Sequence, residues 1–105
     1  MSNIIFFHYR EPGISIEEMN KAWSDETQVS IISRLPGITK YVENHVIKDE
    51  TGVKCDGIGE LWFESDKKLD SEINSPLWSE AVEDAKRYID LEPSGAIIVR
   101  EVNMN

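Results

Sequence analysis

The segment "ITKYVENHVIKDETGVKCDGIGELWFE", residues 38–64, carries the clearest structural pattern in the chain. Both of its ends are rich in β-branched and aromatic residues, which favour strands. The polar segment "KDETG" (48–52) between them has the composition of a turn. We therefore predict two strands, at about 38–47 and 56–64, that pair antiparallel as a hairpin.

Polar side chains occupy both faces of the first of these strands, although usually only one face of a sheet meets water. Alternation puts Thr39, Tyr41, Glu43 and His45 on one face, and Ile38, Val42, Asn44 and Val46 on the other. Polar groups on a covered face need hydrogen-bond partners or a pocket. The pattern indicates a ligand site on this sheet.

Strands and helices are also predicted on both sides of the hairpin. Residues 3–9 and 96–102 read as strands. Ser15 and Glu18 have capping-box spacing, so a helix of about five turns should begin near Ile16 and end before "RLPG" (34–37). A second helix should start at Pro76, with Ser75 as N-cap, and a short surface helix should carry Leu69 and Ile73.

The order of these elements, βαββαβ, is that of a ferredoxin-like α+β fold. The 105 residues suffice for a single domain, residues 1–105, in which two helices cover one face of a four-stranded antiparallel sheet. The other face would then expose apolar side chains. We expect a homodimer that packs sheet face against sheet face.

Charge and composition exclude several partners. The chain has 11 basic and 20 acidic residues, a net charge of −9, which disfavours nucleic acid and anionic membranes. No apolar segment is long enough to span a membrane. The one cysteine, Cys55, cannot form an internal disulfide, and two isolated histidines do not make a metal site. We expect a cytoplasmic protein without a bound metal.

Three motifs resemble the EthD family of the dimeric α/β-barrel superfamily. They are "LPGITKYVENHV" (35–46), "CDGIGELWFES" (55–65) and "SPLWSEAVEDAKRYID" (75–90), and the likeness runs in order from about Phe6 to Val102. The resemblance implies a ferredoxin-like protomer, a homodimer whose sheets form a barrel, and a small pocket between sheet and helices. Many sequences of that family carry a histidine one turn after the tryptophan of the first helix. Here Thr27 or Gln28 stands at that place after Trp23.

Relatives in this superfamily act as dehydratases, cyclases, decarboxylases, isomerases or cofactor-free monooxygenases, so the fold leaves the reaction open. We expect a small cofactor-independent enzyme of the dehydratase, cyclase or isomerase type that acts on a small aromatic or carbonyl-bearing metabolite. A cofactor-free monooxygenase is one alternative. A ligand-binding or accessory dimer without catalysis is another.

Two residues are the candidates for catalysis. His45 can exchange protons near neutral pH, and Glu60, between apolar neighbours on its strand, is a candidate general base. The alternatives are a structural histidine and an ion pair of Glu60 with Lys40 or Arg100. His8 is expected to be a hydrogen-bonded core or interface histidine.

The aromatic residues are the candidates for the walls of the site. Aromatic side chains first of all fill the core, but they also suit a flat apolar ligand. The expected walls are Trp23, Tyr41, Trp62 and Trp78. Gly57 and Gly59 alternate on one face of their strand and permit a close approach by a helix or a ligand.

Overall fold

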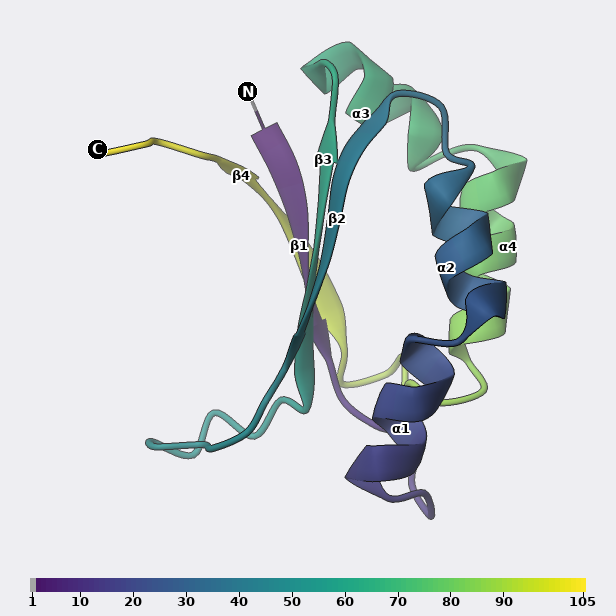
Figure 1. Cartoon of the computed structure of the whole chain (residues 1–105), viewed down its shortest axis with the longest axis vertical. Helices are drawn as coiled ribbons and strands as arrows, with labels where there is room; N and C mark the ends of the chain where they lie inside the picture. Colours follow the sequence, from purple (N-terminus) through teal and green to yellow (C-terminus); the bar gives the residue numbers. More distant parts are fainter. Residues whose placement is uncertain (1) are drawn as a thin grey trace.

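A computed structural model describes residues 2–105. Its elements follow in the order β1 (Ser2–His8), α1 (Ile16–Trp23), α2 (Glu26–Ser33), β2 (Ile38–His45), β3 (Gly57–Phe63), α3 (Asp66–Glu72), α4 (Pro76–Ala85) and β4 (Gly95–Arg100). The strands form one antiparallel sheet in the order β2-β3-β1-β4. The helices all lie on the same side of the sheet (Figure 1). The ferredoxin-like α+β fold is confirmed, with strand ends within two residues of the predicted ones.

The predicted helix starts are confirmed. Ser15 Oγ accepts from the Glu18 N–H at 3.0 Å, and the Glu18 carboxylate accepts from the Ser15 N–H at 3.1 Å, which completes the capping box. Ser75 caps α4 in the same way by accepting from the Trp78 N–H at 3.1 Å. These caps fix where the two helices that cover the sheet begin.

The single helix predicted from Ile16 to about residue 34 is wrong, because the structure divides it into α1 and α2. Ser24 closes α1, and Asp25 takes the extended conformation (φ −64°, ψ 148°) of a residue that precedes a helix. Serine and aspartate favour such positions, since their short polar side chains compete for backbone hydrogen bonds. Here the Ser24 hydroxyl instead bonds to Glu43 on β2, at 2.6 Å.

The hairpin is confirmed, with one irregularity that changes a face assignment. The β2–β3 register pairs Tyr41 with Leu61 and His45 with Gly57, but it shifts between Ile38 and Lys40. A bulge inserts an extra residue and changes the alternation beyond it. Ile38 consequently packs in the core on the same face as Tyr41, not on the opposite face as predicted.

Two apolar clusters fill the space between sheet and helices. The larger joins β1, β3, α2, α3 and α4 around Leu35, Leu61, Phe63 and Leu69, each 2% exposed or less. The smaller joins α1 to the chain after α4 through Met19, Trp23, Tyr88 and Ile89. The region where the two clusters meet contains the pocket described below.

The opposite face of the sheet has no helix over it in the described chain (Figure 1). By the register of the strands it carries Ile5, Phe7, Ile58, Val99 and Ile97, the last of which is 49% exposed. The prediction of an apolar second face is confirmed. None of the helices within residues 2–105 is long and apolar enough to cross a membrane.

Candidate functional site

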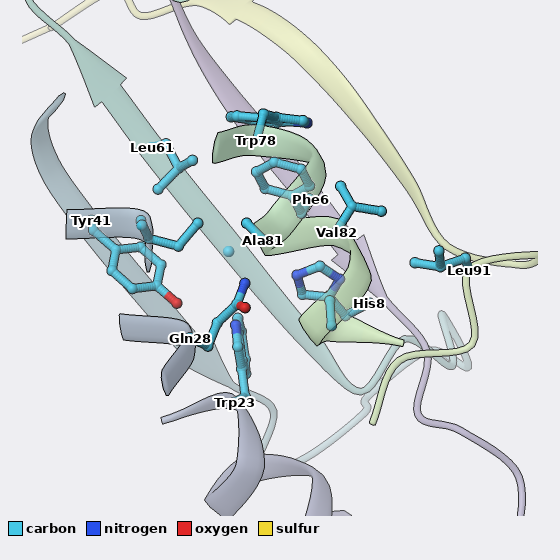
Figure 2. A pocket seen from close by; sticks show the side chains of 13 residues that line it. Phe6, His8, Trp23, Gln28, Tyr41, Leu61, Trp78, Ala81, Val82 and Leu91 are labelled. Carbon is cyan, nitrogen blue, oxygen red and sulfur yellow. The ribbon is translucent and has the colours of Figure 1, made fainter. Parts of the chain in front are cut away.

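A cavity of about 100 Å³ lies between the helix-covered face of the sheet and helices α1, α2 and α4. In Figure 2 Gln28 lies between Tyr41 and His8, with Trp23 at one end and Phe6 and Trp78 at the other. Val82 and Leu91 are 37% and 41% exposed and mark its edge. The lining residues are Phe6, His8, Trp23, Gln28, Ile32, Tyr41, Gly59, Leu61, Trp78, Ala81, Val82, Ala85 and Leu91.

Aromatic rings form much of the wall. Phe6 stacks on His8 with ring centroids 5.6 Å apart and lies 5.8 Å from Trp78. Trp23 meets the His8 ring edge to face at 5.1 Å. Such rings suit a flat apolar ligand. The structure therefore places the predicted wall residues Trp23, Tyr41 and Trp78 at this cavity.

Two glycines let the benzene edge of the Trp23 indole approach the sheet closely. An ideal Cβ on Gly57 would be 2.6 Å from Trp23 Cζ3, and one on Gly59 would be 3.2 Å from Trp23 Cζ2. The predicted close approach at these glycines is confirmed, and the approaching group is the indole.

His8 is the imidazole in the cavity wall. Burial lowers its pKa to about 4, while the negative charge of Glu43 acts in the opposite direction. The ring is therefore neutral at pH 7. Its Nδ1 is buried without a hydrogen-bond partner in the described chain. The expectation that His8 is a hydrogen-bonded core or interface histidine is therefore wrong as to the hydrogen bonding of this nitrogen.

Tyr41 and Glu43 form the second polar element of the site. The Tyr41 hydroxyl donates to Glu43 Oε2 at 2.6 Å. Burial raises the pKa of Tyr41, and this hydrogen bond to Glu43 raises it further. Tyr41 is thus a neutral phenol whose proton is directed at a carboxylate, away from other partners.

The other oxygen of Glu43 connects Tyr41 to His45. Glu43 Oε1 accepts from Ser24 Oγ at 2.6 Å and lies 3.1 Å from His45 Nε2. The carboxylate side chain is 12% exposed and the imidazole 37%. His45 also lies against Trp23, with centroids 5.2 Å apart. Tyr41 and His45, too far apart along the strand for a direct bond, are therefore joined through Glu43.

Many EthD-family sequences carry a histidine one turn after the tryptophan of the first helix, and in this chain either Thr27 or Gln28 could take that place. The structure puts Gln28 there. Gln28 is 7% exposed and lines the cavity, while Thr27 is exposed to solvent. With its amide in the orientation that satisfies its neighbours, the nitrogen donates to Asp84 Oδ2 at 2.8 Å and to the Ala81 carbonyl at 3.2 Å. Its carbonyl oxygen is not used by these bonds.

Glu60 and Trp62 lie on the opposite face of the sheet. Residues of β3 alternate, and Gly59, Leu61 and Phe63 take the helix-covered side. Glu60 accepts from Asn44 Nδ2 at 3.3 Å. Trp62 lies under the Lys40 ammonium, 4.7 Å from its ring, and donates to Glu101 at 3.3 Å. Trp62 is absent from the cavity lining, so its predicted place in the wall is wrong. His45 and Glu60 lie on opposite faces of the sheet, and a catalytic role for either stays a prediction.

Three polar residues of the site, His8, Gln28 and Glu43, were not among the predicted site residues. The alternation of Ile4, Phe6 and His8 in β1 was the available signal for His8, since apolar neighbours on one face mark the covered side. Glu43 shared the predicted face of Tyr41 and His45. Gln28 carried no such signal, because its inward position depends on the break between α1 and α2.

Within residues 2–105 no group of three histidine, cysteine, aspartate or glutamate residues could hold a metal ion.

The fold and the pocket together define a ferredoxin-like α+β protein with one small cavity between sheet and helices. No family model matches the sequence, and no curated protein matches it. Solved structures do match in shape. An ethyl tert-butyl ether D (EthD) family protein from Bacillus halodurans has a TM-score of 0.78 at 14% identity, over 97% of this chain and 99% of that one.

Two further structures share this fold. A dimeric protein of ferredoxin-like fold from Bacteroides fragilis has a TM-score of 0.68 at 10% identity, over 95% of each chain. SnoaB, a cofactor-independent oxygenase from Streptomyces nogalater, has a TM-score of 0.67 at 7% identity, over 98% of this chain and 94% of that one. At these identities the likeness shows the fold, and it agrees with the EthD resemblance of the sequence.

Proposed function

We propose that the protein binds a compact aromatic or carbonyl-bearing metabolite in this pocket and moves a proton on it, as in dehydration, cyclisation or isomerisation, without a bound cofactor. One observation carries the proposal. A neutral imidazole, His8, and a phenol joined to a carboxylate, Tyr41 with Glu43, face the same aromatic cavity. Apolar sites that hold such proton-transfer groups are typical of active sites.

The two polar elements suit opposite ends of an enolisation. A neutral imidazole can donate a hydrogen bond from its N–H to a carbonyl oxygen and stabilise the enolate charge that develops there. A proton leaving the neighbouring carbon would pass to the Tyr41 oxygen as the Tyr41 proton passes to Glu43 Oε2. The electron pair of the broken C–H bond forms the carbon–carbon double bond, and the π pair of the carbonyl moves to the oxygen, which becomes an enolate held by the His8 N–H. The reverse movement returns the proton to carbon.

Deuterium exchange tests this proposal without knowledge of the natural substrate. The protein is incubated with acetophenone in D₂O near pH 7, and loss of the methyl proton signal is followed by NMR. We expect exchange above the buffer rate, reduced at least tenfold in His8→Gln and in Tyr41→Phe, which corresponds to about 1.4 kcal/mol of barrier. Glu64→Gln, an exposed carboxylate after β3, is the matched control.

The same assay tests the predicted roles of His45 and Glu60. His45→Ala should reduce exchange if the contact of His45 with Glu43 matters. Glu60→Gln should reduce it only if the opposite face takes part. Exchange at the buffer rate for the unaltered protein would contradict the proposed proton transfer.

A cofactor-free monooxygenase is the second candidate. It is favoured by the aromatic cavity together with the structural likeness to SnoaB. Oxygen uptake with methylhydroquinone, above the rate without protein and reduced in Tyr41→Phe, would support it. Ligand binding without either activity would instead support a non-catalytic binding or accessory protein.

We also propose that two copies associate through the bare face of the sheet. This face exposes apolar side chains in the single chain, and the related fold from Bacteroides fragilis is dimeric. A two-fold contact of this kind buries the same patch on both copies.

A further inference from the structure

The polar groups of the cavity differ in what they can offer a ligand. The Tyr41 hydroxyl has one proton, and that proton is donated to Glu43 Oε2 at 2.6 Å. Toward the cavity the Tyr41 oxygen can therefore only accept a hydrogen bond. Gln28 is in a similar position, because its nitrogen donates to Asp84 and to the Ala81 carbonyl.

No positively charged side chain lines the cavity in the described chain. Among the lining residues that the structure describes there is no lysine or arginine, and His8 is neutral at pH 7. Directly behind Tyr41 is the Glu43 carboxylate, with Ser24 and His45 as its other neighbours. The Asp84 carboxylate behind Gln28 is paired with Arg87, at 2.8 Å and 3.2 Å. A second negative charge placed beside Tyr41 would have no cation in the wall to offset its desolvation.

We infer that the pocket selects uncharged ligands that donate a hydrogen bond, such as a phenolic or enolic hydroxyl, to the Tyr41 oxygen, and that it rejects carboxylates of the same shape. Glu43 acts through Tyr41 as a positioning residue, because it holds the phenolic proton away from the cavity. The inference rests on the proposal that this cavity is a small-molecule site. It is independent of any proton transfer.

Four compounds that share the toluene skeleton test this specificity by quenching of tryptophan fluorescence, since Trp23 and Trp78 lie in the wall. They are 4-methylphenol (a donor), 4-methylanisole (an acceptor only), toluene (neither) and 4-methylbenzoate (an anion at pH 7). We expect 4-methylphenol to bind roughly tenfold more tightly than 4-methylanisole and toluene, the value of one buried hydrogen bond. The benzoate should bind more weakly than any of the other three.

Variants separate recognition by Tyr41 from simple apolar binding. Tyr41→Phe should bind 4-methylphenol and toluene equally. Glu43→Gln should reduce the affinity difference between 4-methylphenol and toluene, because the amide can leave the Tyr41 proton free to point into the cavity. It should also weaken the discrimination against 4-methylbenzoate, because the negative charge behind Tyr41 is gone. Glu64→Gln should behave as the unaltered protein.

Three results would overturn the inference. One is 4-methylbenzoate binding as tightly as 4-methylphenol, a second is a phenol preference unchanged in Tyr41→Phe, and a third is no binding of any of the four compounds. Circular dichroism of each variant confirms that it is folded. If the pocket prefers 4-methylphenol but the protein does not catalyse deuterium exchange, only the proposed proton transfer is refuted. If the protein catalyses exchange but lacks this ligand preference, only the inference about ligand selection is refuted.

Discussion

Trp23 lies on Gly57 so closely that no larger residue fits beneath the indole, since an ideal Cβ there would be 2.6 Å from Cζ3. A rigid ring and a β-strand backbone give little room for adjustment. Gly57→Ala should therefore displace Trp23 and lower the free energy of unfolding by about 1–3 kcal/mol. Urea denaturation measures the change.

Gly95→Ala is the control for this substitution. A Cβ at Gly95 meets nothing within 4 Å. The unfolding free energy of Gly95→Ala should stay within about 0.5 kcal/mol of that of the unaltered protein. An equal loss in both variants would show that the contact with Trp23 is not the cause.

The buried imidazole of His8 should make stability depend on pH. Its pKa falls from 6.5 in the unfolded chain to about 4 in the folded one, so the folded state favours the neutral ring. The stabilisation is complete above pH 6.5 and is lost as the pH falls toward 4. The loss should amount to about 3 kcal/mol.

Comparison with His8→Gln isolates this contribution from the many carboxylates that also titrate. The difference in unfolding free energy between the two proteins, measured by urea denaturation at several pH values, should shrink between pH 6.5 and pH 4. A difference that stays constant over this range would contradict a buried neutral His8.

Two of the three tyrosines should resist ionisation. Burial raises the pKa of both Tyr41 and Tyr88, and the Glu43 and Asp84 carboxylates add to it. Both phenols should stay protonated in the folded protein at pH 10.5, where a free tyrosine is largely ionised. The stabilisation that follows from a raised pKa is present below pH 10 and is lost as the pH rises further.

Absorbance at 295 nm measures this directly. Denaturing the protein with urea at pH 10.5 should increase the phenolate absorbance by about one and a half tyrosines, because each free phenol is about three-quarters ionised there. In Tyr41→Phe the increase should fall to about half of that. Full ionisation of every tyrosine before denaturation would refute the buried phenols.

A pair of neighbouring residues on β4 tests the proposed dimer. Ile97 lies on the bare face and is 49% exposed, and Ile98 lies on the helix-covered face and is 50% exposed. Light scattering should give twice 12.0 kDa for the unaltered protein and 12.0 kDa for Ile97→Lys. Ile98→Lys should remain dimeric, because its charge points to the other face. A monomeric unaltered protein would refute the association.

Local patterns predicted most of the fold. The hairpin, the capping box at Ser15 and the start of α4 at Pro76 each depend on neighbouring residues, whose preferences can be read directly. The features that were predicted wrongly depend on contacts between residues far apart in the sequence. The bulge after Ile38 and the end of α1 at Ser24 have no strong local signal, and the latter is coupled to Glu43 on another element.

The site was predictable only in part for the same reason. Alternation along β2 placed Tyr41 and His45 together, and the aromatic composition indicated Trp23 and Trp78. The alternation of residues in β3 did not show which of its faces the helices cover. Both faces are partly apolar, one carrying Glu60 and Trp62 and the other Leu61 and Phe63. His8 was underestimated because a lone histidine in a strand usually has a partner.

The break between α1 and α2 sets the angular phase of the pocket residues. In an unbroken helix each residue turns about 100°, so a residue five positions after Trp23 would point about 140° away from it. A residue four positions after it would be only about 40° away, which is the geometry of a tryptophan–histidine pair on one turn. The extended Asp25 resets the rotation and brings Gln28 to the same cavity as Trp23. In this chain, therefore, the backbone conformation of Asp25, a residue outside the pocket, determines that Gln28 is the side chain beside the Trp23 indole.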